Sequence, residues 1–321
     1  MPHFNVDTTV DEVINTFGKY AAGKTFVITG PSVGGIGATA ATALAQARPK
    51  QLILAGRTLS RIQPSIDEIT KLSPTTAAIF VELDLADLSS VRRAASEIKH
   101  LAADGIHALF NNGGIMAPRE FAKTTDGVEA QFATNHLGHF LLTNLLLPEI
   151  SKARGVVTTA TGRSWTMVDP DYDDVNFDDG KNYHGWIAFS RSKTANIHFS
   201  KALARRVDKL GVSAFAVDPG TVLDSKLIAN SSVDNDWVNE AMRLITERGN
   251  RDLLGPVISL QQGAASAVLT FLGPSLRAMS GAYLEECEVR DRKLAGYVTD
   301  EAQAEKLWRL SEVLVGEKFS W

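Results

Sequence analysis

Phe189 and Lys193 lie four residues apart in the segment GWIAFSRSKTAN, residues 185–196. In a helix this spacing places both side chains on one face, one turn apart. A tyrosine at the first position would form a proton-donating pair with the lysine, because a nearby ammonium lowers the tyrosine pKa from about 10. The ring is present at position 189, but the hydroxyl is absent. The segment therefore has the spacing of an acid–base site without its acid.

A second candidate for chemistry is the glycine-rich turn in KTFVITGPSVGGIGATAATALA, which begins at Lys24. Its glycines let the backbone approach a pyrophosphate, and the N-terminus of the helix that follows offers unpaired N–H groups and a favourable dipole. Glycines commonly serve only to make turns, but a position between a strand and a helix favours dinucleotide binding. The residues expected to contact the cofactor here are Gly30, Ser32, Gly35, Ile36 and Gly37.

The end of the next apolar run, LILAGRT, bears on which cofactor is bound. A site that prefers NAD has an acid here for the ribose 2′-hydroxyl, whereas this chain has Gly56 followed by Arg57. A guanidinium forms charge-assisted hydrogen bonds with a 2′-phosphate. Arg57 on its own reads equally well as a solvated surface arginine, but after the glycine-rich turn it predicts NADP(H).

Short apolar runs alternate with helical patterns from residue 24 onward, which predicts a Rossmann-type α/β fold with a doubly wound parallel sheet in a single domain. Runs such as FVIT and LILA are apolar throughout, as is typical of strands buried on both faces. The domain is expected to span residues 23–321, after a helical extension at residues 1–22. Residues 223–258 are interpreted as a helical insertion that serves as a substrate lid.

The composition argues against several classes of protein. The chain has 321 residues, 44% of them hydrophobic and 22% charged, and its net charge of −4 is too small to indicate a nucleic-acid-binding surface. Cys287 is the only cysteine, so no intrachain disulfide is possible. The N-terminal segment lacks the apolar core of a signal peptide, and no apolar run approaches the roughly 20 residues that span a bilayer. We expect a cytoplasmic protein without a membrane span.

The motifs TGPSVGGIG, LDLADLSSV, NNGGI, TNHLGHF, FSRSKTAN and DPG occur in this order and together resemble the short-chain dehydrogenase/reductase family. The C-terminal segments SGAYLEECEV and AEKLWRLSEVLVG are similar to its retinol-dehydrogenase-like and WW-domain-oxidoreductase-like branch, in particular to fungal members. The resemblance covers residues 23–318, with a glycine turn one residue longer than the common form TGxxxGIG. It implies an oxidoreductase that interconverts a carbonyl and an alcohol with a nicotinamide cofactor.

The resemblance also implies roles for individual residues. Asn135 matches the catalytic asparagine that holds a water in a proton relay, and Lys193 matches the lysine that binds the nicotinamide ribose. Thr161 stands where a serine usually polarises the substrate carbonyl, and Phe189 stands at the position of the tyrosine itself. Further cofactor contacts implied by position are Asp84 at the adenine end, Leu85, Asn112, Gly113, Lys193, Pro219, Gly220 and Val222.

The catalytic set therefore lacks its general acid. The cofactor supplies the hydride and the protein must supply the proton, which Phe189 does not have. Loss of a positioned general acid costs about 10² to 10⁴ in rate. Tyr183 and His184 are poor substitutes because neither has the i+4 relation to Lys193, while Ser164 is an alternative carbonyl-polarising hydroxyl. We expect a chain that binds NADP(H) and reduces carbonyls poorly.

Two explanations of Phe189 stay open. An engineered Tyr-to-Phe change would leave the rest of the site intact, and the presence of Asn135 and Lys193 favours it. Natural divergence would alter several positions, and it is favoured by Thr161 together with Asp224, which stands where the family has a threonine. Divergence allows two other functions, namely a non-catalytic NADP(H)-binding protein or a repurposed non-redox enzyme such as a cyclase or isomerase.

Met116, Trp165 and Trp186 are expected near the substrate crevice. If they line it, the substrate is a bulky, largely apolar carbonyl or alcohol. No metal site is expected, because the acidic segment 169–179 lacks the glycine and glutamate of a calcium loop and no third ligand accompanies the histidines of TNHLGHF. A homodimer through the helices that hold the catalytic asparagine and lysine is possible, although the small residues of SKTANIHFSKALA would pack equally well on the chain's own sheet.

Overall fold

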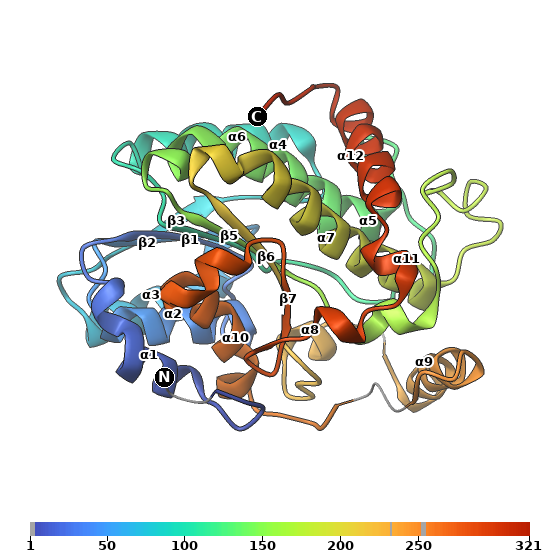
Figure 1. Ribbon diagram of the computed structural model, residues 1–321, viewed down its shortest axis with the longest axis horizontal. Coiled ribbons are helices and arrows are strands. Elements are labelled where there is room, and N and C mark those ends of the chain that lie inside the picture. The colour runs from blue at the N-terminus through green and yellow to red at the C-terminus, as the bar shows by residue number, and fades with distance from the viewer. Residues whose placement is uncertain (1–3, 232, 252–254) are drawn as a thin grey trace.

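The computed structural model describes residues 4–231, 233–251 and 255–321, and its centre is a twisted, largely parallel sheet (Figure 1). Within these residues the strand order is β3-β2-β1-β4-β5-β6-β7-β8, and β8 runs antiparallel to its neighbour. The strands are β1 (Thr25–Thr29), β2 (Gln51–Gly56), β3 (Ala77–Glu82), β4 (Ala108–Asn111), β5 (Val156–Ala160), β6 (Ser213–Asp218), β7 (Tyr283–Glu285) and β8 (Glu288–Val289). The predicted doubly wound sheet is confirmed.

Helices cover both faces of the sheet, because the central strands are apolar on both sides. Val27 and Ile53 pack into one core, whereas Phe26 and Leu52, their neighbours along the chain, pack into the other. One face carries α1 (Val10–Phe17), α2 (Ile36–Gln46), α3 (Leu59–Leu72) and α10 (Leu260–Leu272). The other carries α4 (Leu88–Leu101), the short α5 (Ala130–Phe132), α6 (Gly138–Lys152) and α7 (Gly185–Val207), with α11 (Gly296–Thr299) and α12 (Glu301–Val315) outside them.

The strand order reverses at β1, because β1 pairs with β2 on one side and with β4 on the other. In open α/β sheets a ligand binds at the carboxyl ends of the strands, where the direction changes. The glycine-rich turn follows β1, Asn112 follows β4, Thr161 follows β5 and Pro219 follows β6. The fold thus brings four distant parts of the sequence to one edge.

Both segments predicted as additions to the domain contain helices. Val10 and Val13 of α1 pack into the core beneath α2 and α10, and residues 1–3 lie outside the described residues. The predicted lid contains α8 (Lys226–Ala229) and α9 (Asn235–Glu247), while its residues 232 and 252–254 lie outside the described residues. Because α9 contacts the 3₁₀ turn that follows β5, the insertion lies beside the carboxyl edge of the sheet.

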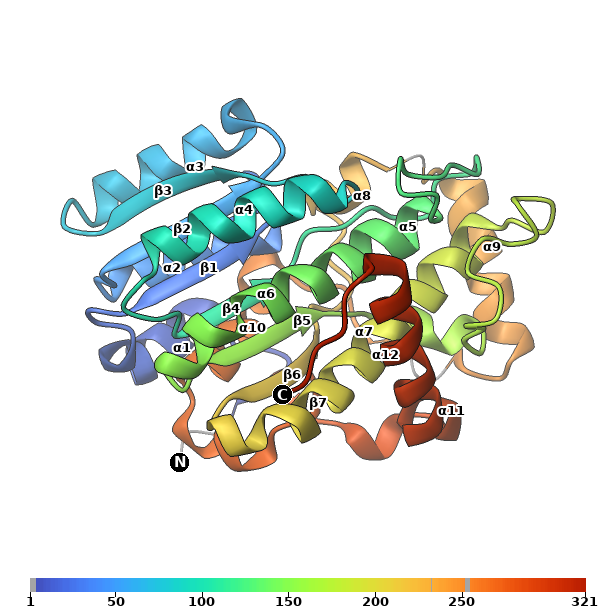
Figure 2. The same cartoon turned by 90° about the horizontal axis from the view of Figure 1, so that it is seen from above.

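The last helix, α12, lies along α7 (Figure 2). Its Trp308 sits between α6 and α7, with ring centroids 5.0 Å from Phe140 and 6.0 Å from Phe199. Beyond the helix, the ring N–H of Trp321 donates to Oδ1 of Asn144 at 2.9 Å. The chain's own C-terminal segment therefore covers α6 and α7. None of the described helices is both long and apolar enough to cross a bilayer.

Candidate active site

Glycine is required at two positions of the turn after β1. Gly30 has φ +65°, and a Cβ there would lie 2.7 Å from Cα of Gly113. A Cβ at Gly37 would lie 2.6 Å from Nδ2 of Asn112. The turn after β1 and the segment after β4 touch only because both glycines lack a side chain. This contact forms one wall of the predicted cofactor site.

Thr29, the last residue of β1, links this wall to the helix that carries Asn135. Its hydroxyl oxygen accepts the N–H groups of Asn112 and Gly113, both at 2.9 Å. The same oxygen lies 2.9 Å from Nε2 of His139, whose Nδ1 is 3.0 Å from the backbone carbonyl of Asn135. Since a carbonyl only accepts, Nδ1 carries the proton and Nε2 accepts from Thr29. Burial keeps the ring neutral by lowering the pKa of His139 to about 4.

The N-terminus of α2 has the features of an anion site. Its N-cap is Gly35, and no side chain of the described residues caps the N–H groups of the first turn. Three other predicted cofactor contacts, Ile36, Pro219 and Val222, lie close together. A Cβ placed on Gly263 would be within 2.9 Å of an atom of each. A helix N-terminus without a side-chain cap, set behind a glycine turn, fits the pyrophosphate of a dinucleotide.

The remaining predicted contacts of this part lie around the same wall. The Leu85 side chain would be 2.8 Å from a Cβ at Gly113. The carbonyl of Ser32 accepts the N–H of the α2 N-cap at 3.0 Å. Gly220 has φ +75°, and its N–H donates to Oδ1 of Asp218 at 2.8 Å. The structure therefore brings the glycine-turn contacts and the contacts after β3, β4 and β6 to one place.

Gly56 and Arg57 end β2 beside this wall. A Cβ at Gly56 would lie 2.7 Å from Cδ1 of Ile62 in α3, so Ile62 would have to move before an acid could stand there. Arg57 is exposed, and no carboxylate of the described residues forms an ion pair with it. Asp84, after β3, accepts the N–H of Ala86 at 2.9 Å through its carboxylate. The end of β2 is thus followed by an exposed guanidinium that has no ion-pair partner among the described residues, and it carries no carboxylate at position 56.

Asn135 lies in a single turn of π-helix, Ala133–Leu137, between α5 and α6, and such turns are frequent at functional sites. Its Oδ1 accepts the N–H of Ile115 at 2.9 Å. Its Nδ2 donates to the carbonyl of Ile115 and to Oγ of Ser192, both at 3.0 Å. The buried side chain therefore ties the segment after β4 to α7.

Lys193 and Phe189 share one face of α7, and Nζ of the lysine is 5.5 Å from the centroid of the ring. The Thr161 hydroxyl donates to the Lys193 carbonyl at 2.7 Å, and Nζ donates to the carbonyl of Ala160 at 3.3 Å. Burial lowers the pKa of Lys193 to about 8, although the carboxylate of Asp218 acts in the opposite direction. The structure thus brings the predicted lysine, threonine and aromatic positions together.

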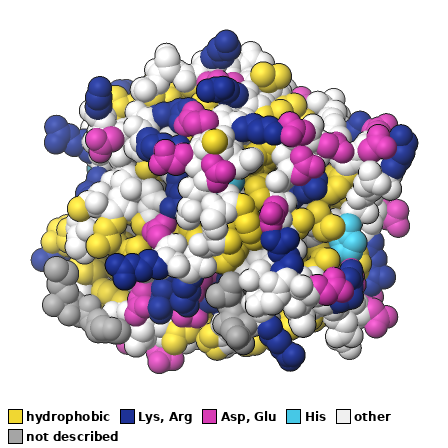
Figure 3. All heavy atoms as spheres, turned by 45° about the vertical axis from the view of Figure 1, so that its right-hand side comes forward, with side chains coloured by type: hydrophobic (Ala, Val, Ile, Leu, Met, Phe, Trp, Pro, Cys, Tyr) yellow, Lys and Arg dark blue, Asp and Glu magenta, His cyan; other side chains and the backbone are white. Residues whose placement is uncertain are grey.

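An apolar cluster adjoins Phe189, and the ring of Trp186 meets that of Phe189 edge to face at 5.9 Å. The other buried members are Ala117, Met167, Ala241 and Ile245, with Met116, Val233, Trp237 and Leu244 at the periphery. Figure 3 shows hydrophobic side chains gathered on this side of the molecule among charged ones. The two predicted substrate contacts Met116 and Trp186 therefore lie in the same cluster as Phe189, one of the predicted catalytic positions.

Trp165, the third predicted substrate contact, is not brought to this cluster. It packs with Tyr283 of β7 and Val298 of α11 in a separate apolar group. Conversely, sequence reasoning missed Trp237, Ala241 and Ile245 of α9. Their spacing of i, i+4 and i+8 marks one face of a helix, and this periodicity could have identified them.

Arg163 anchors the turn after Thr161 in a buried ionic cluster. Its Nε lies 3.4 Å from Oδ2 of Asp218 and 3.3 Å from Oε2 of Glu285, and its Nη2 lies 2.7 Å from Glu286. Lys293 pairs with Glu285 at 2.9 Å. Because the cluster joins the ends of β5, β6 and β7, it fixes the turn that follows Thr161, one of the predicted catalytic positions.

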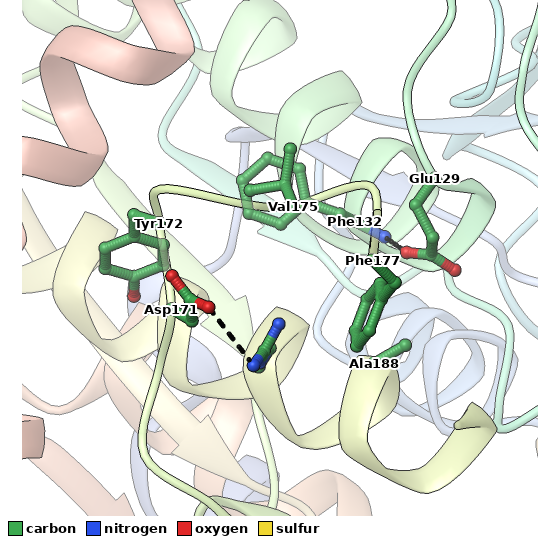
Figure 4. A pocket seen from close by; sticks show the side chains of 8 residues that line it. Glu129, Phe132, Asp171, Tyr172, Val175, Phe177 and Ala188 are labelled. Carbon is green, nitrogen blue, oxygen red and sulfur yellow. Dashed lines mark hydrogen bonds and ion pairs between the residues drawn. The ribbon is translucent and has the colours of Figure 1, made fainter. Parts of the chain in front are cut away.

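A small cavity lies against the other side of α7 (Figure 4). It is lined by Glu129, Phe132, Asp171, Tyr172, Val175, Phe177, Ala188 and Arg191. The Glu129 carboxylate accepts the N–H of Gln131 at 2.9 Å and of Phe132 at 2.7 Å, while burial raises its pKa to about 7. The acidic segment 169–179 contributes Asp171, which pairs with Arg191 at 3.4 Å. Across the described residues no three His, Cys, Asp or Glu side chains are grouped as metal ligands.

Comparisons with known proteins indicate the family of this chain. The sequence model of short chain dehydrogenases matches residues 24–164. Retinol dehydrogenase 11 of Mus musculus is 32% identical over 306 residues, which are 93% of this chain and 88% of that protein. Oxidoreductase fscI of Fusarium equiseti is 33% identical over 244 residues, which are 68% of this chain and 94% of that protein.

Solved structures share the fold of this chain. An uncharacterized protein from Mycobacterium Paratuberculosis has a TM-score of 0.68 at 29% identity, covering 94% of this chain and 96% of that chain. A short chain dehydrogenase from Burkholderia cenocepacia, solved in complex with NADP, has a TM-score of 0.64 at 22% identity, covering 83% and 97%. With the glycine turn, the π-turn asparagine and the buried lysine in their places, this chain belongs to the short-chain dehydrogenase family of oxidoreductases, in its retinol-dehydrogenase-like branch.

Proposed function

We propose that the protein uses NADP(H) to interconvert a carbonyl and an alcohol on a bulky, largely apolar small molecule, in a form impaired by Phe189. The observation that carries this proposal is the meeting, at one sheet edge, of the glycine wall, the buried Lys193 and the apolar cluster around Trp186. A dinucleotide site, a cation and an apolar surface are what such a reaction requires.

NADP(H) is proposed over NAD(H) because of the end of β2. Arg57 is exposed and unpaired among the described residues, and Ile62 packs where an acid at position 56 would stand. An exposed guanidinium suits a 2′-phosphate, whereas a 2′-hydroxyl needs an acceptor. The Burkholderia cenocepacia neighbour, solved with NADP, is consistent with this choice.

The substrate class follows from the cluster beside Phe189. Trp186, Met167 and the α9 face supply aromatic and aliphatic surface and no charge, so a largely apolar molecule would lose little hydration on binding. The relatives named as retinol dehydrogenases act, by their names, on one bulky apolar alcohol. We propose an apolar aldehyde, ketone or alcohol, with α9 as the lid.

We propose a separate role in binding or positioning for each part of the site. When bound, NADPH supplies a hydride to the substrate carbon. The α2 N-terminus and the glycine wall would hold the pyrophosphate, Arg57 the 2′-phosphate and Lys193 the nicotinamide ribose. Asn135 would keep the segment after β4 in place through its two hydrogen bonds to Ile115. A tyrosine hydroxyl would have protonated the oxygen, and Phe189 does not.

We also propose that the protein works as a single chain in the cytoplasm. A homodimer through α6 and α7 would need the faces that Trp308 and Trp321 cover. The one cysteine, Cys287, is buried, which is compatible with a reducing compartment.

The test compares the protein with its Phe189→Tyr variant. Binding of NADPH and NADH to both is measured first by nucleotide fluorescence, and then NADPH consumption with all-trans-retinal, decanal and aryl ketones. We expect tighter binding of NADPH than of NADH, and a gain of about 10² to 10⁴ in turnover with tyrosine. NADPH binding without consumption by either protein would favour a non-catalytic binding protein, and product without NADPH consumption would favour a cyclase or isomerase.

A further inference from the structure

Three hydroxyl groups near Phe189 already donate hydrogen bonds to backbone carbonyls. Thr161 donates to the carbonyl of Lys193 at 2.7 Å, Ser190 to the carbonyl of Ser164 at 2.6 Å, and Ser192 to the carbonyl of Phe189 at 2.7 Å. A hydroxyl has one hydrogen to donate. None of these three groups can therefore protonate a substrate without breaking a buried hydrogen bond.

Tyr183, Trp186 and Trp237 also donate hydrogen bonds to backbone carbonyls. The Tyr183 hydroxyl donates to the carbonyl of Pro118 at 3.1 Å. The ring N–H of Trp186 donates to the carbonyl of Trp237 at 2.7 Å, and the ring N–H of Trp237 donates to the carbonyl of Ala117 at 2.8 Å. These bonds tie the start of α7 and the lid to each other and to the segment after β4, so the three donors would have to break them to transfer a proton.

Ser164 is buried, with 9% of the residue exposed, and its hydroxyl has no hydrogen-bond partner among the described residues. An aliphatic hydroxyl can donate a hydrogen bond to a substrate oxygen. It does not release its proton near neutral pH unless a base takes that proton. Ser164 is thus suited to polarise a carbonyl and not to protonate the alkoxide.

Lys193 is the donor that lies beside the Phe189 ring, with Nζ 5.5 Å from the ring centroid. Its ammonium has three hydrogens and one hydrogen-bond acceptor among the described residues, the carbonyl of Ala160 at 3.3 Å. No carboxylate of these residues lies within ion-pair distance. Two charged or titratable groups face it: Asp218 at the end of β6, which favours the ammonium, and His139 of α6, whose pKa the ammonium lowers. Burial brings the pKa of Lys193 to about 8, which suits proton transfer near neutrality.

We propose that in this chain Lys193 itself donates the proton to the carbonyl oxygen, in place of the missing tyrosine hydroxyl. This inference rests on the proposed function. As the hydride forms a bond to the carbonyl carbon, the electron pair of the C=O π bond moves to oxygen. That oxygen takes a proton from Nζ, where one N–H bond breaks and leaves a neutral amine. Water then returns a proton to the amine.

The first test does not depend on turnover. The cofactor-free protein is incubated with decanal and cyanoborohydride from pH 7 to pH 9.5, and modified lysines are identified by peptide mass spectrometry. An amine that reaches the carbonyl of a bound substrate forms an imine, so we expect labelling of Lys193 that rises around its pKa of about 8. Labelling of surface lysines such as Lys209 while Lys193 stays unmodified throughout would overturn the proposal.

The second test uses Lys193→Arg, with Lys209→Arg as the control. Arginine keeps the positive charge but does not release a proton. We expect NADPH affinity within a few fold of the parent by fluorescence, with kcat for the aldehyde that supports turnover reduced at least about 100-fold. The parent's kcat should fall above about pH 8 as Lys193 loses its proton, and Phe189→Tyr should move this fall.

The outcomes separate this inference from the proposed function. If Phe189→Tyr consumes NADPH and the parent does not, the lysine-donor proposal is wrong and the proposed function stands. If Lys193→Arg matches the parent in kcat at equal NADPH affinity, the donor is another group and the proposal is again wrong. If neither the parent nor Phe189→Tyr binds NADPH, the proposed function fails and the inference fails with it.

Discussion

Nζ of Lys193 lies 5.5 Å from the centroid of the Phe189 ring, so the ammonium faces an aromatic ring at the position where the family resemblance predicts a tyrosine hydroxyl. A cation near a desolvated ring contributes about 1–2 kcal/mol of attraction. That attraction helps to keep the lysine in place but gives it no partner for proton transfer. The charge of the predicted tyrosine–lysine pair is thus retained, while the tyrosine hydroxyl is absent.

Replacement of Arg57 should separate the two nicotinamide cofactors. In Arg57→Gln we expect NADPH affinity to fall about 10- to 100-fold, because one or two hydrogen bonds to a charged phosphate are lost. NADH affinity should stay the same. Fluorescence titration of both cofactors measures this, with the exposed Arg309→Gln in α12 as the control. Equal losses for both cofactors would show that Arg57 does not contact the 2′-phosphate.

Gly30→Ala should damage both stability and cofactor binding. The residue has φ +65°, and a Cβ would lie 2.7 Å from the backbone of Gly113, so the turn after β1 must shift. We expect a loss of more than about 1 kcal/mol in the free energy of unfolding and much weaker NADPH binding. Gly296→Ala is the matched control, since a Cβ there meets nothing within 4 Å. An unchanged melting temperature for Gly30→Ala would contradict the close contact.

Glu129 should make the protein less stable as pH rises. Its pKa is about 7 in the folded chain, because of burial, and about 4.5 when unfolded, so folding favours the protonated form. The stabilisation from this proton is complete below about pH 4.5 and is lost as pH rises to about 7. Relative to the parent, Glu129→Gln should therefore gain about 1–3 kcal/mol between pH 5 and pH 8.

Urea unfolding at several pH values measures this change, and the pH-dependent difference isolates the charge from the hydrogen bonds that glutamine alters at every pH. The exposed Glu120→Gln serves as control. A constant difference between Glu129→Gln and the parent would mean that the carboxyl ionises normally.

Trp308→Ala should strongly destabilise the fold. The side chain is 3% exposed and packs between Phe140 and Phe199, with the Arg206 guanidinium 4.0 Å from its ring centroid. Removal of such a buried ring costs about 3–5 kcal/mol. Val313→Ala on the same helix, where 74% of the side chain is exposed, should change little. Denaturant unfolding compares the two, and similar small effects would mean that α12 is not part of the core.

The sheet and the site positions after its strands could be predicted from the sequence because both depend on local signals. Apolar runs such as that of β2 mark buried strands, and Gly30 and Gly37 mark a turn that side chains would block. The order of the motifs then specifies which strand ends carry which residues. These signals need no knowledge of how distant side chains pack.

Trp165 shows where the sequence stops being informative. It follows Ser164 directly, yet the 3₁₀ turn directs it to Tyr283 and Val298 and not to Phe189. The side of a short turn to which a residue points depends on its long-range partners, and here the cluster around Arg163 sets that turn. The position of α12 and the bonds that occupy Thr161 also depend on contacts between distant residues, which no local pattern encodes.

The packing of α12 against α7 has a kinetic consequence. In an enzyme whose catalytic helices are completed by a second subunit, dilution separates the subunits and one site can influence another. Here Trp308 packs against both helices from within the chain, as the proposed single-chain form requires. Specific activity should therefore be independent of enzyme concentration, and substrate saturation should be hyperbolic with no cooperativity between sites.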